Sequence, residues 1–262
     1  GIHIIDLHKS LEKLEEAAAA LKSIARSGKK ILFVATKKQA KELVAEQARL
    51  VGMPHVTERW LGGMLTNFST IRKSIKKMQS IEKTLADTTV DSLTKKERLV
   101  MSREKAKLER VIGGIAQINR LPSAIFMVDI SHEHIALAEA KKLGLTTFGM
   151  VDTNSDPTSV DFAIPANDDA SKSVTIITKY LTEAIKEGLA ERKQNKEDMI
   201  AAKHGENDGE DGGEAKPKER SGDRRRAAGG RRKKTVTADA PVEATPKKEE
   251  KVQEPAKAEA AE

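Results

Sequence analysis

The sequence predicts an α/β domain built on a doubly wound parallel sheet. Strands that are apolar on both faces, such as residues 31–35 and, apart from Asp129, residues 124–130, alternate with helical patterns, as in βαβ units. One connection, residues 67–119, holds more helix than a crossover between parallel strands needs. The last 62 residues are charged and carry almost no core-forming side chains. We expect one α/β domain at 1–195, an antiparallel helical hairpin inserted at about 67–119, and a disordered charged tail at 196–262.

The first part of the domain is predicted to contain two helices and two strands. A helical pattern covers about Ser10 to Arg26, and the buried strand 31–35 follows it. Thr36 and Gln39 stand at capping-box spacing, which predicts that the next helix opens there. Residues 55–60 are typical of a short strand that enters a loop.

The inserted segment has the pattern of two helices joined by a turn at about 86–92. Thr94 and Glu97 form a second capping box, which predicts the start of the second helix. The first helix is predicted from apolar residues that step by three or four positions along one face. This stripe consists of Ile71, Ile75, Met78, Ile81 and Leu85.

After Pro122 the alternation of strands and helices resumes. The predicted elements are strand 124–130, helix 131–143, strand 146–151, an edge strand at 162–164, and a helix from after Asp169 to about Arg192.

Positive charge is concentrated in the hairpin. Residues 69–112 hold 12 Lys and Arg against 6 Asp and Glu, an excess of six that equals the excess of residues 1–200 as a whole. A helix with cations on one face fits a phosphate backbone, and a solvated lysine-rich face is the alternative interpretation. Single-strand binders need exposed aromatic platforms, and only seven aromatic residues are present, so folded RNA is the better match. The basic run 224–234 in the tail is compatible with RNA contact or with a purely solubilising role.

The usual signatures of an enzyme are missing. The chain has no dinucleotide-binding glycine fingerprint, no P-loop and no nucleophile elbow, so no cofactor is expected. Several Asp residues follow the strands, among them Asp129, Asp152, Asp168 and Asp169. They fit a divalent-ion or phosphoryl site, but we favour helix capping and turn chemistry, and expect no metal. The chain contains no cysteine and no apolar window of membrane-spanning length, so no membrane is expected.

Residues 59–68 (RWLGGMLTNF) are the most unusual segment. Trp60, the only tryptophan, stands beside Arg59, and two glycines and a polar helix start follow. Glycines allow close approach of the backbone, and helix-start amides favour phosphate. A tight turn with Trp60 as core filler is the alternative.

Four motifs in this order closely resemble the bacterial-type small-subunit ribosomal protein "S two" family. The resemblance covers about residues 1–190, with Ser155 and Ala166 standing where many members have Cys and Gly. Members usually carry a further segment before the part that matches Gly1. The motifs are 31–40 (ILFVATKKQA), 59–68, 151–157 (VDTNSDP) and 164–170 (IPANDDA).

The resemblance implies a flavodoxin-like domain with an inserted hairpin and no catalytic activity. It also implies a structural constituent of the small ribosomal subunit, cytoplasmic and active in translation. The implied partners are small-subunit ribosomal RNA and other small-subunit proteins, including the large protein "S one". The alternatives are a flavodoxin-like nucleotide-binding or enzymatic domain, and an adaptor whose hairpin docks on another protein.

We expect the RNA contacts on the hairpin, the 59–68 segment and the end of the first strand. Lys37 and Lys38 are expected to open a helix, where the helix dipole adds to their charge. The candidate residues are Lys37, Lys38, Arg59, Trp60, Asn67, Arg72, Lys73, Lys76 and Lys77.

Overall fold

A computed structural model describes residues 3–86 and 94–207 of the 262-residue chain. The predicted turn at 86–92, apart from Ala86, and the tail from residue 208 lie outside these ranges. No helix within the described residues is long and apolar enough to cross a membrane.

The centre of the fold is a sheet of five parallel strands in the order β2-β1-β3-β4-β5. This is the flavodoxin-like order, and it confirms the predicted doubly wound α/β class. The strands are β1 (Ile31–Val34), β2 (His55–Val56), β3 (Ala124–Val128), β4 (Thr146–Val151) and β5 (Phe162–Pro165).

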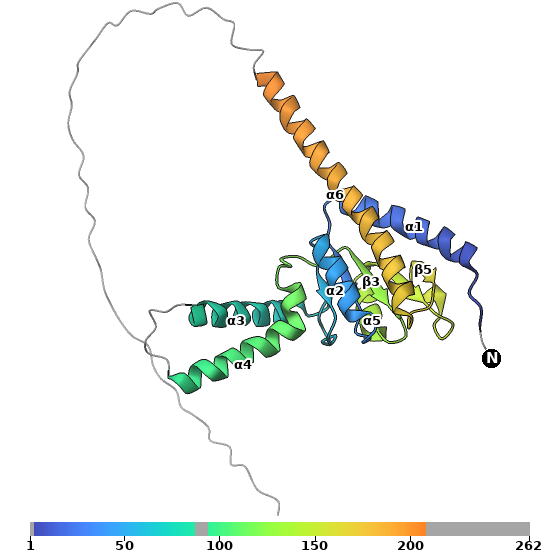
Figure 1. Ribbon diagram of the computed structural model, residues 1–262. Coiled ribbons are helices and arrows are strands. Elements are labelled where there is room, and N and C mark those ends of the chain that lie inside the picture. The colour runs from blue at the N-terminus through green and yellow to red at the C-terminus, as the bar shows by residue number, and fades with distance from the viewer. Residues whose placement is uncertain (1–2, 87–93, 208–262) are drawn as a thin grey trace, which may run out of the picture. The chain divides into compact units, whose positions relative to one another are not determined.

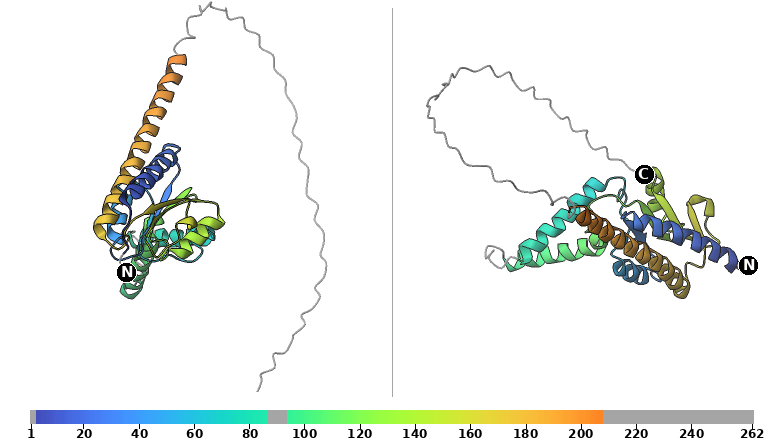
Figure 2. Two further views of the ribbon diagram at one scale, coloured as in Figure 1. Left: turned by 90° about the vertical axis from the view of Figure 1, so that its right-hand side faces the viewer. Right: turned by 90° about the horizontal axis from the view of Figure 1, so that it is seen from above.

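Helices cover both faces of the sheet (Figures 1 and 2). Ile31 and Phe33 of β1 pack with α1, α2 and α6, whereas Leu32 and Val34 pack with α5, residues 60–65 and the base of the hairpin. Both faces of β1 are therefore buried, as its unbroken apolar sequence predicts. The helices are α1 (Leu7–Arg26), α2 (Lys41–Leu50), α3 (Phe68–Ala86), α4 (Lys95–Ile112), α5 (His134–Lys142) and α6 (Ser171–Asn207), with 3₁₀ turns at Gly113–Ile115 and Pro157–Ser159.

Helices α3 and α4 form the predicted hairpin, which extends from the sheet (Figure 1). Ile71 and Ile75 of α3 bury their side chains in the core beside the sheet. The predicted capping box of Thr94 and Glu97 is present at the start of α4. At the hairpin root, a Cβ on Gly114 would lie 2.2 Å from the carbonyl oxygen of His55, so only glycine lets the root approach β2 this closely.

Helix α2 begins at Lys41, so the capping box predicted at Thr36 is wrong. The amide and hydroxyl of Thr36 both donate to Glu133 Oε1, at 2.8 and 2.6 Å. This contact holds Thr36 against the residue that precedes α5, and Lys37 and Lys38 lie in the segment before α2, so they do not open the helix as expected.

The start of α5 also differs from the prediction. α5 begins at His134 because Asp129, in the left-handed region at φ 64°, accepts the amides of Ser131 and His132 with its Oδ1, at 3.0 Å each. These bonds hold residues 131–133 in a turn, where the sequence predicts the first helical residues.

The capping prediction for Asp168 and Asp169 is wrong. Both carboxylates bind Lys37 instead, and Asn167 forms the turn before α6, where its Oδ1 accepts the amides of Asp169 and Ala170 at 2.9 Å each. Asn and Asp are equally good at such positions, so composition alone does not choose between three consecutive candidates.

Some element lengths also depart from the prediction. α1 begins at Leu7 because the side chain of Asp6 caps it, and β2 covers two residues where six are expected. α6 continues past Arg192 to Asn207, so residues 196–207, expected in the tail, are helical.

Candidate nucleic-acid interface

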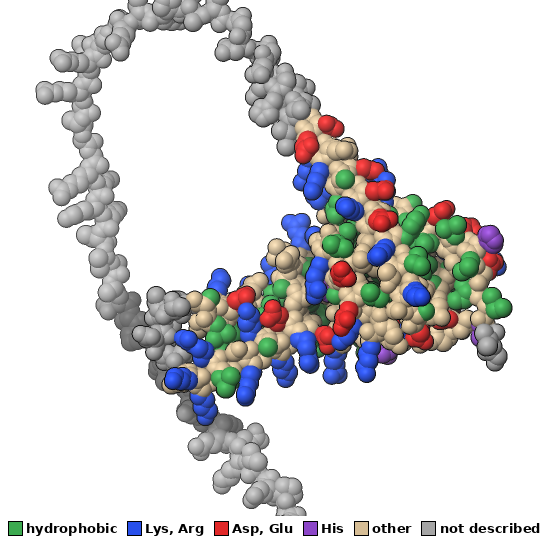
Figure 3. Space-filling model, in the orientation of Figure 1, with side chains coloured by type: hydrophobic (Ala, Val, Ile, Leu, Met, Phe, Trp, Pro, Cys, Tyr) green, Lys and Arg blue, Asp and Glu red, His purple; other side chains and the backbone are tan. Residues whose placement is uncertain are grey.

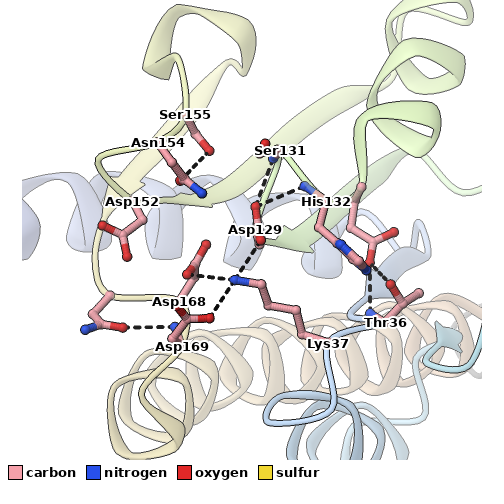
Figure 4. Close-up of polar contacts among 12 residues, drawn as sticks. Thr36, Lys37, Asp129, Ser131, His132, Asp152, Asn154, Ser155, Asp168 and Asp169 are labelled. Carbon is pink, nitrogen blue, oxygen red and sulfur yellow. Dashed lines mark hydrogen bonds and ion pairs between the residues drawn. The ribbon is translucent and has the colours of Figure 1, made fainter.

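The carboxyl ends of the strands carry a group of charged side chains, the Lys37 cluster, made of Lys37, Asp129, Asp168 and Asp169. Lys37 follows β1, and its ammonium lies 2.7 Å from Asp129 Oδ2, 2.9 Å from Asp168 Oδ1 and 2.8 Å from Asp169 Oδ1. Figure 4 shows the lysine pointing between the three carboxylates. The side chains of Asp129 and Asp168 are only 5% and 2% exposed, whereas that of Asp169 is 68% exposed, so two of the three carboxylates are withdrawn from water.

Burial and ion pairing act in opposite directions on these groups. Burial lowers the pKa of Lys37, but hydrogen bonds to the three carboxylates outweigh it and hold this pKa above its ordinary value. Burial raises the pKa of Asp129, yet Lys37 and two backbone amides bring it below its usual range. For Asp168 burial prevails, so its pKa is raised, and its Oδ2 lacks a hydrogen-bond partner among the described residues.

The Lys37 cluster fills the place where doubly wound folds bind their ligands, outside the carboxyl ends of the strands. The chain's own ammonium already sits between the carboxylates, where a ligand cation would bind. A phosphate there would meet four carboxylates, counting Asp152 on the same edge (Figure 4). Within residues 3–86 and 94–207, no group of three or more metal-ligating side chains could hold an ion. The geometry therefore favours an internal structural role.

The 59–68 segment is organised by a residue that the sequence did not single out, Glu139 of α5. Its Oε1 accepts the indole N–H of Trp60 at 3.1 Å and the amide of Gly63 at 2.7 Å. Its Oε2 accepts the amides of Leu65 and Thr66 at 2.9 and 3.1 Å, and the Thr66 hydroxyl at 3.2 Å. We call residues 59–67 the Trp60 loop, because this one buried carboxylate fixes its path.

Glu139 is ionised in this setting. Burial raises its pKa, but the amides of Thr66 and Leu65, the Trp60 indole and the Gly63 amide lower it further, so the pKa lies below the ordinary value. In sequence Glu139 resembles any surface acid on an amphipathic helix, and its partners are more than 70 residues away. No local signal could have revealed it.

The Trp60 loop turns a different set of side chains outward. Trp60 itself is 8% exposed, so it fills the core and offers no stacking platform. Arg59 and Asn67, at the two ends of the loop, are exposed. Asn67 Oδ1 accepts the hydroxyls of Ser69 and Thr70 at 3.1 and 3.0 Å, which fixes the start of α3.

The hairpin carries most of the remaining candidates, and all of them are exposed. Figure 3 shows Lys and Arg side chains in a row over the hairpin and along the adjoining edge of the domain. Lys77 pairs with Glu104 of α4, whereas Arg72, Lys73 and Lys76 make no ion pair with any residue that the structure describes. Lys38 is likewise exposed, unlike its neighbour Lys37.

The nine candidates thus separate into two groups. Lys37 and Trp60 are turned into the domain and hold its carboxyl edge and the Trp60 loop in place. The other seven lie on the surface, in the segment after β1, at the ends of the Trp60 loop and along α3.

A doubly wound domain whose ligand edge is filled by its own side chains, and which presents a basic helical hairpin, is typical of a non-catalytic scaffold that associates with RNA. The family model described as ribosomal protein S2 matches residues 1–188, and the chain belongs to this family.

Its relatives carry the name small ribosomal subunit protein uS2. The protein of Cytophaga hutchinsonii is 64% identical over 198 residues, which cover 76% of this chain and 78% of that protein. The protein of Bacteroides fragilis is 61% identical over 202 residues, 77% and 73% of the two chains. That of Porphyromonas gingivalis is 60% identical over 195 residues, 74% and 69% of the two chains.

Family membership confirms the resemblance that the four motifs indicate. The chain is a structural ribosomal protein of the small subunit, not an enzyme, and acts in translation in the bacterial cytoplasm. Neither the family model nor the relatives named above support the alternative of a flavodoxin-like enzyme.

Proposed function

We propose that the chain binds folded small-subunit ribosomal RNA through one basic surface formed by α3 and the exposed ends of the Trp60 loop. The observation that carries this proposal is the exposure of cations on α3 that no carboxylate neutralises within the described residues. Such side chains release counterions when they meet phosphates, which supplies sequence-independent affinity. The rigid α/β body holds them in register.

The proposed contacts differ in kind. Lys38, Arg59, Arg72, Lys73 and Lys76 are exposed, make no ion pair with a described residue, and offer their positive charge to phosphates. Asn67 marks the start of α3, where helix-start amides also favour phosphate. Lys77 shares its charge with Glu104 and so contributes less, whereas Lys37 and Trp60 act by positioning.

The test is a triple variant in which Lys73, Lys76 and Lys77 are each replaced by Ala. Binding to small-subunit ribosomal RNA is expected to weaken, and the slope of log affinity against log salt to fall by about 0.7–0.9 for each phosphate that the variant no longer neutralises. The matched control is Lys172, Lys179 and Lys186 to Ala, three exposed lysines on α6. An unchanged slope in the first variant would remove the hairpin from the RNA interface.

We also propose neighbouring small-subunit proteins, including the large S one protein, as protein partners. Supporting this, Leu7 and Leu11 of α1 and Ile176 and Tyr180 of α6 are exposed on two helices that pack together. Exposed apolar groups of this kind are typical of protein contacts. A pull-down of the S one protein that is unaffected by Ile176→Lys would contradict this surface.

A further inference from the structure

A basic pocket lies at the amino ends of the strands, opposite the edge that holds the Lys37 cluster. Its volume is about 760 Å³. Lys29 and Lys30 reach it just before β1, Met53 and Pro54 just before β2, and residues 119–123 just before β3. The hairpin root supplies the remaining wall, through Gly113, Gly114 and Gln117. Three strand ends and the inserted hairpin thus meet around one cavity.

The charge lining this pocket is entirely positive. Lys29, Lys30, Arg49 and Arg120 line it, and no Asp or Glu is among the lining residues. The Arg192 guanidinium of α6 lies against Gly28, another lining residue, and brings a fifth cation to the rim. The Glu109 side chain of α4 lies against Gly113, also a lining residue, and brings one carboxylate to the rim. Cations still outnumber carboxylates around the pocket, whereas in the Lys37 cluster one cation meets three carboxylates. Such a cavity raises the local concentration of anions.

The pocket also offers groups that fit a nucleobase. Met53, Pro54, Ile118 and Leu121 provide apolar wall, and guanidinium groups such as that of Arg120 stack on base faces. The exposed amide side chains of Gln117 and Asn119 can both donate and accept hydrogen bonds, as the edge of a base requires. The pocket therefore combines cations that can bind a phosphate with apolar and amide side chains that can contact a base. Its volume is typical of small-ligand sites.

One of the lining cations is held in place before any ligand arrives. Lys30 Nζ donates to the carbonyl oxygen of Gly52 at 2.8 Å, which fixes its direction. The His55 ring lies against the root at Gly114, and burial, followed by the charge of Arg49, lowers its pKa. His55 is therefore neutral at pH 7 and adds no charge of its own. Preorganised side chains reduce the entropy cost of binding.

We propose that this basic pocket is a second RNA-binding site, which takes one unstacked nucleotide of ribosomal RNA, with its phosphate on the lysines and its base against Arg120 and Leu121. This inference rests on the proposed RNA-binding function, and it adds a site that recognises a single nucleotide, whereas the hairpin binds backbone charge. The pocket is continuous with the exposed cations of α4, which supports RNA as the source of the nucleotide. The exposed Arg103, Lys107 and Arg110 of α4 lead along the hairpin to the root that lines the pocket.

The first test compares the full chain with a Lys29→Ala, Arg120→Ala double variant. Both residues are exposed and make no ion pair within the described residues, so the fold should persist, as checked by circular dichroism and thermal melting. The salt slope for small-subunit ribosomal RNA is expected to fall by about 0.7–0.9 for each phosphate that loses its cation. The matched control is Lys172→Ala, Lys179→Ala on α6. If the pocket variant behaves like this control, the inference is overturned.

The second test locates the nucleotide. A photo-reactive amino acid in place of Asn119 is expected to crosslink to an unpaired ribosomal nucleotide, and this crosslink should survive the Lys73, Lys76 and Lys77 substitutions. A crosslink confined to paired segments, or none at all, overturns the inference. A further experiment titrates adenosine monophosphate into a solution of the full chain. Saturable binding that ribosomal RNA does not displace overturns the inference in favour of a soluble nucleotide.

The two tests also separate this inference from the proposed function. If the hairpin variant binds RNA more weakly and the pocket variant does not, only the pocket assignment fails. If neither variant changes RNA binding, the proposed interface fails as well.

Discussion

At the scale of single residues, Lys37 and its neighbour Lys38 look interchangeable in sequence and have opposite environments in the fold. Lys37 is surrounded by three carboxylates that come from positions more than 90 residues away, whereas Lys38 faces solvent. The sequence places both lysines at the end of a buried strand, and this is correct. It could not predict which of them the carboxylates of Asp129 and Asp168 would bind, because those partners meet only once the sheet has formed.

Lys37→Met is therefore expected to destabilise the domain. The change leaves Asp129 and Asp168 buried without a counter-charge, which costs about 3–5 kcal/mol. The midpoint of thermal unfolding should fall by on the order of 10 °C. Lys38→Met is the matched control and should change stability by less than about 0.5 kcal/mol. Equal stability of the two variants would contradict the structural role of Lys37. In the folded protein, we expect Lys38→Met to weaken RNA binding more than Lys37→Met.

At the scale of elements, hydrophobic periodicity predicted the order of strands and helices. A strand buried on both faces is apolar throughout, and a helix buried on one face has an apolar stripe, so both can be recognised from neighbouring residues. The hairpin follows from the same logic, since its apolar stripe and the cap at Thr94 are local features. The predicted starts of α2 and α5 were wrong because Glu133 binds Thr36, the expected cap of α2, and Asp129 holds the amides of Ser131 and His132 in a turn before α5. The Trp60 loop was recognisable as unusual, but its anchor, Glu139, is contributed by a distant helix.

The anchoring of the Trp60 loop predicts a pH dependence. Since the pKa of Glu139 is lowered in the folded chain, its contribution to stability is fully present above the unfolded value of 4.5 and is lost as pH falls through the folded value. Glu139→Gln places an amide against five donors and should cost about 3 kcal/mol at pH 7. The difference from the unaltered chain should shrink below pH 4.5. Urea unfolding followed by the fluorescence of Trp60, the only tryptophan, measures both values. A cost that stays constant from pH 7 to pH 3.5 would show that the charge of Glu139 does not hold the loop.

At the scale of the whole molecule, the two edges of the sheet have opposite characters. The carboxyl edge is closed by the Lys37 cluster, whereas the amino edge opens into a cavity lined by cations. The hairpin joins these features, because α3 continues from the Trp60 loop and the segment after α4 lines the pocket. The net charge of the chain and the excess of cations in the hairpin could be predicted from the sequence. The pocket could not be predicted, because its cations come from separate segments that lie close together only once the sheet has formed.

This arrangement predicts that the hairpin and the pocket act on the same RNA as independent sites. Their substitutions lie on different elements and share no partner, so the two decreases in binding free energy should add to within about 0.3–0.5 kcal/mol. The measurement is a double-mutant cycle in small-subunit ribosomal RNA binding, with the Lys73, Lys76, Lys77 variant, the Lys29, Arg120 variant and their combination. If the pocket bound a soluble ligand instead, its substitutions would add nothing to the effect of the hairpin variant. Additivity at low salt, with both effects diminishing as salt rises, is the outcome expected of two cationic sites on one polyanion.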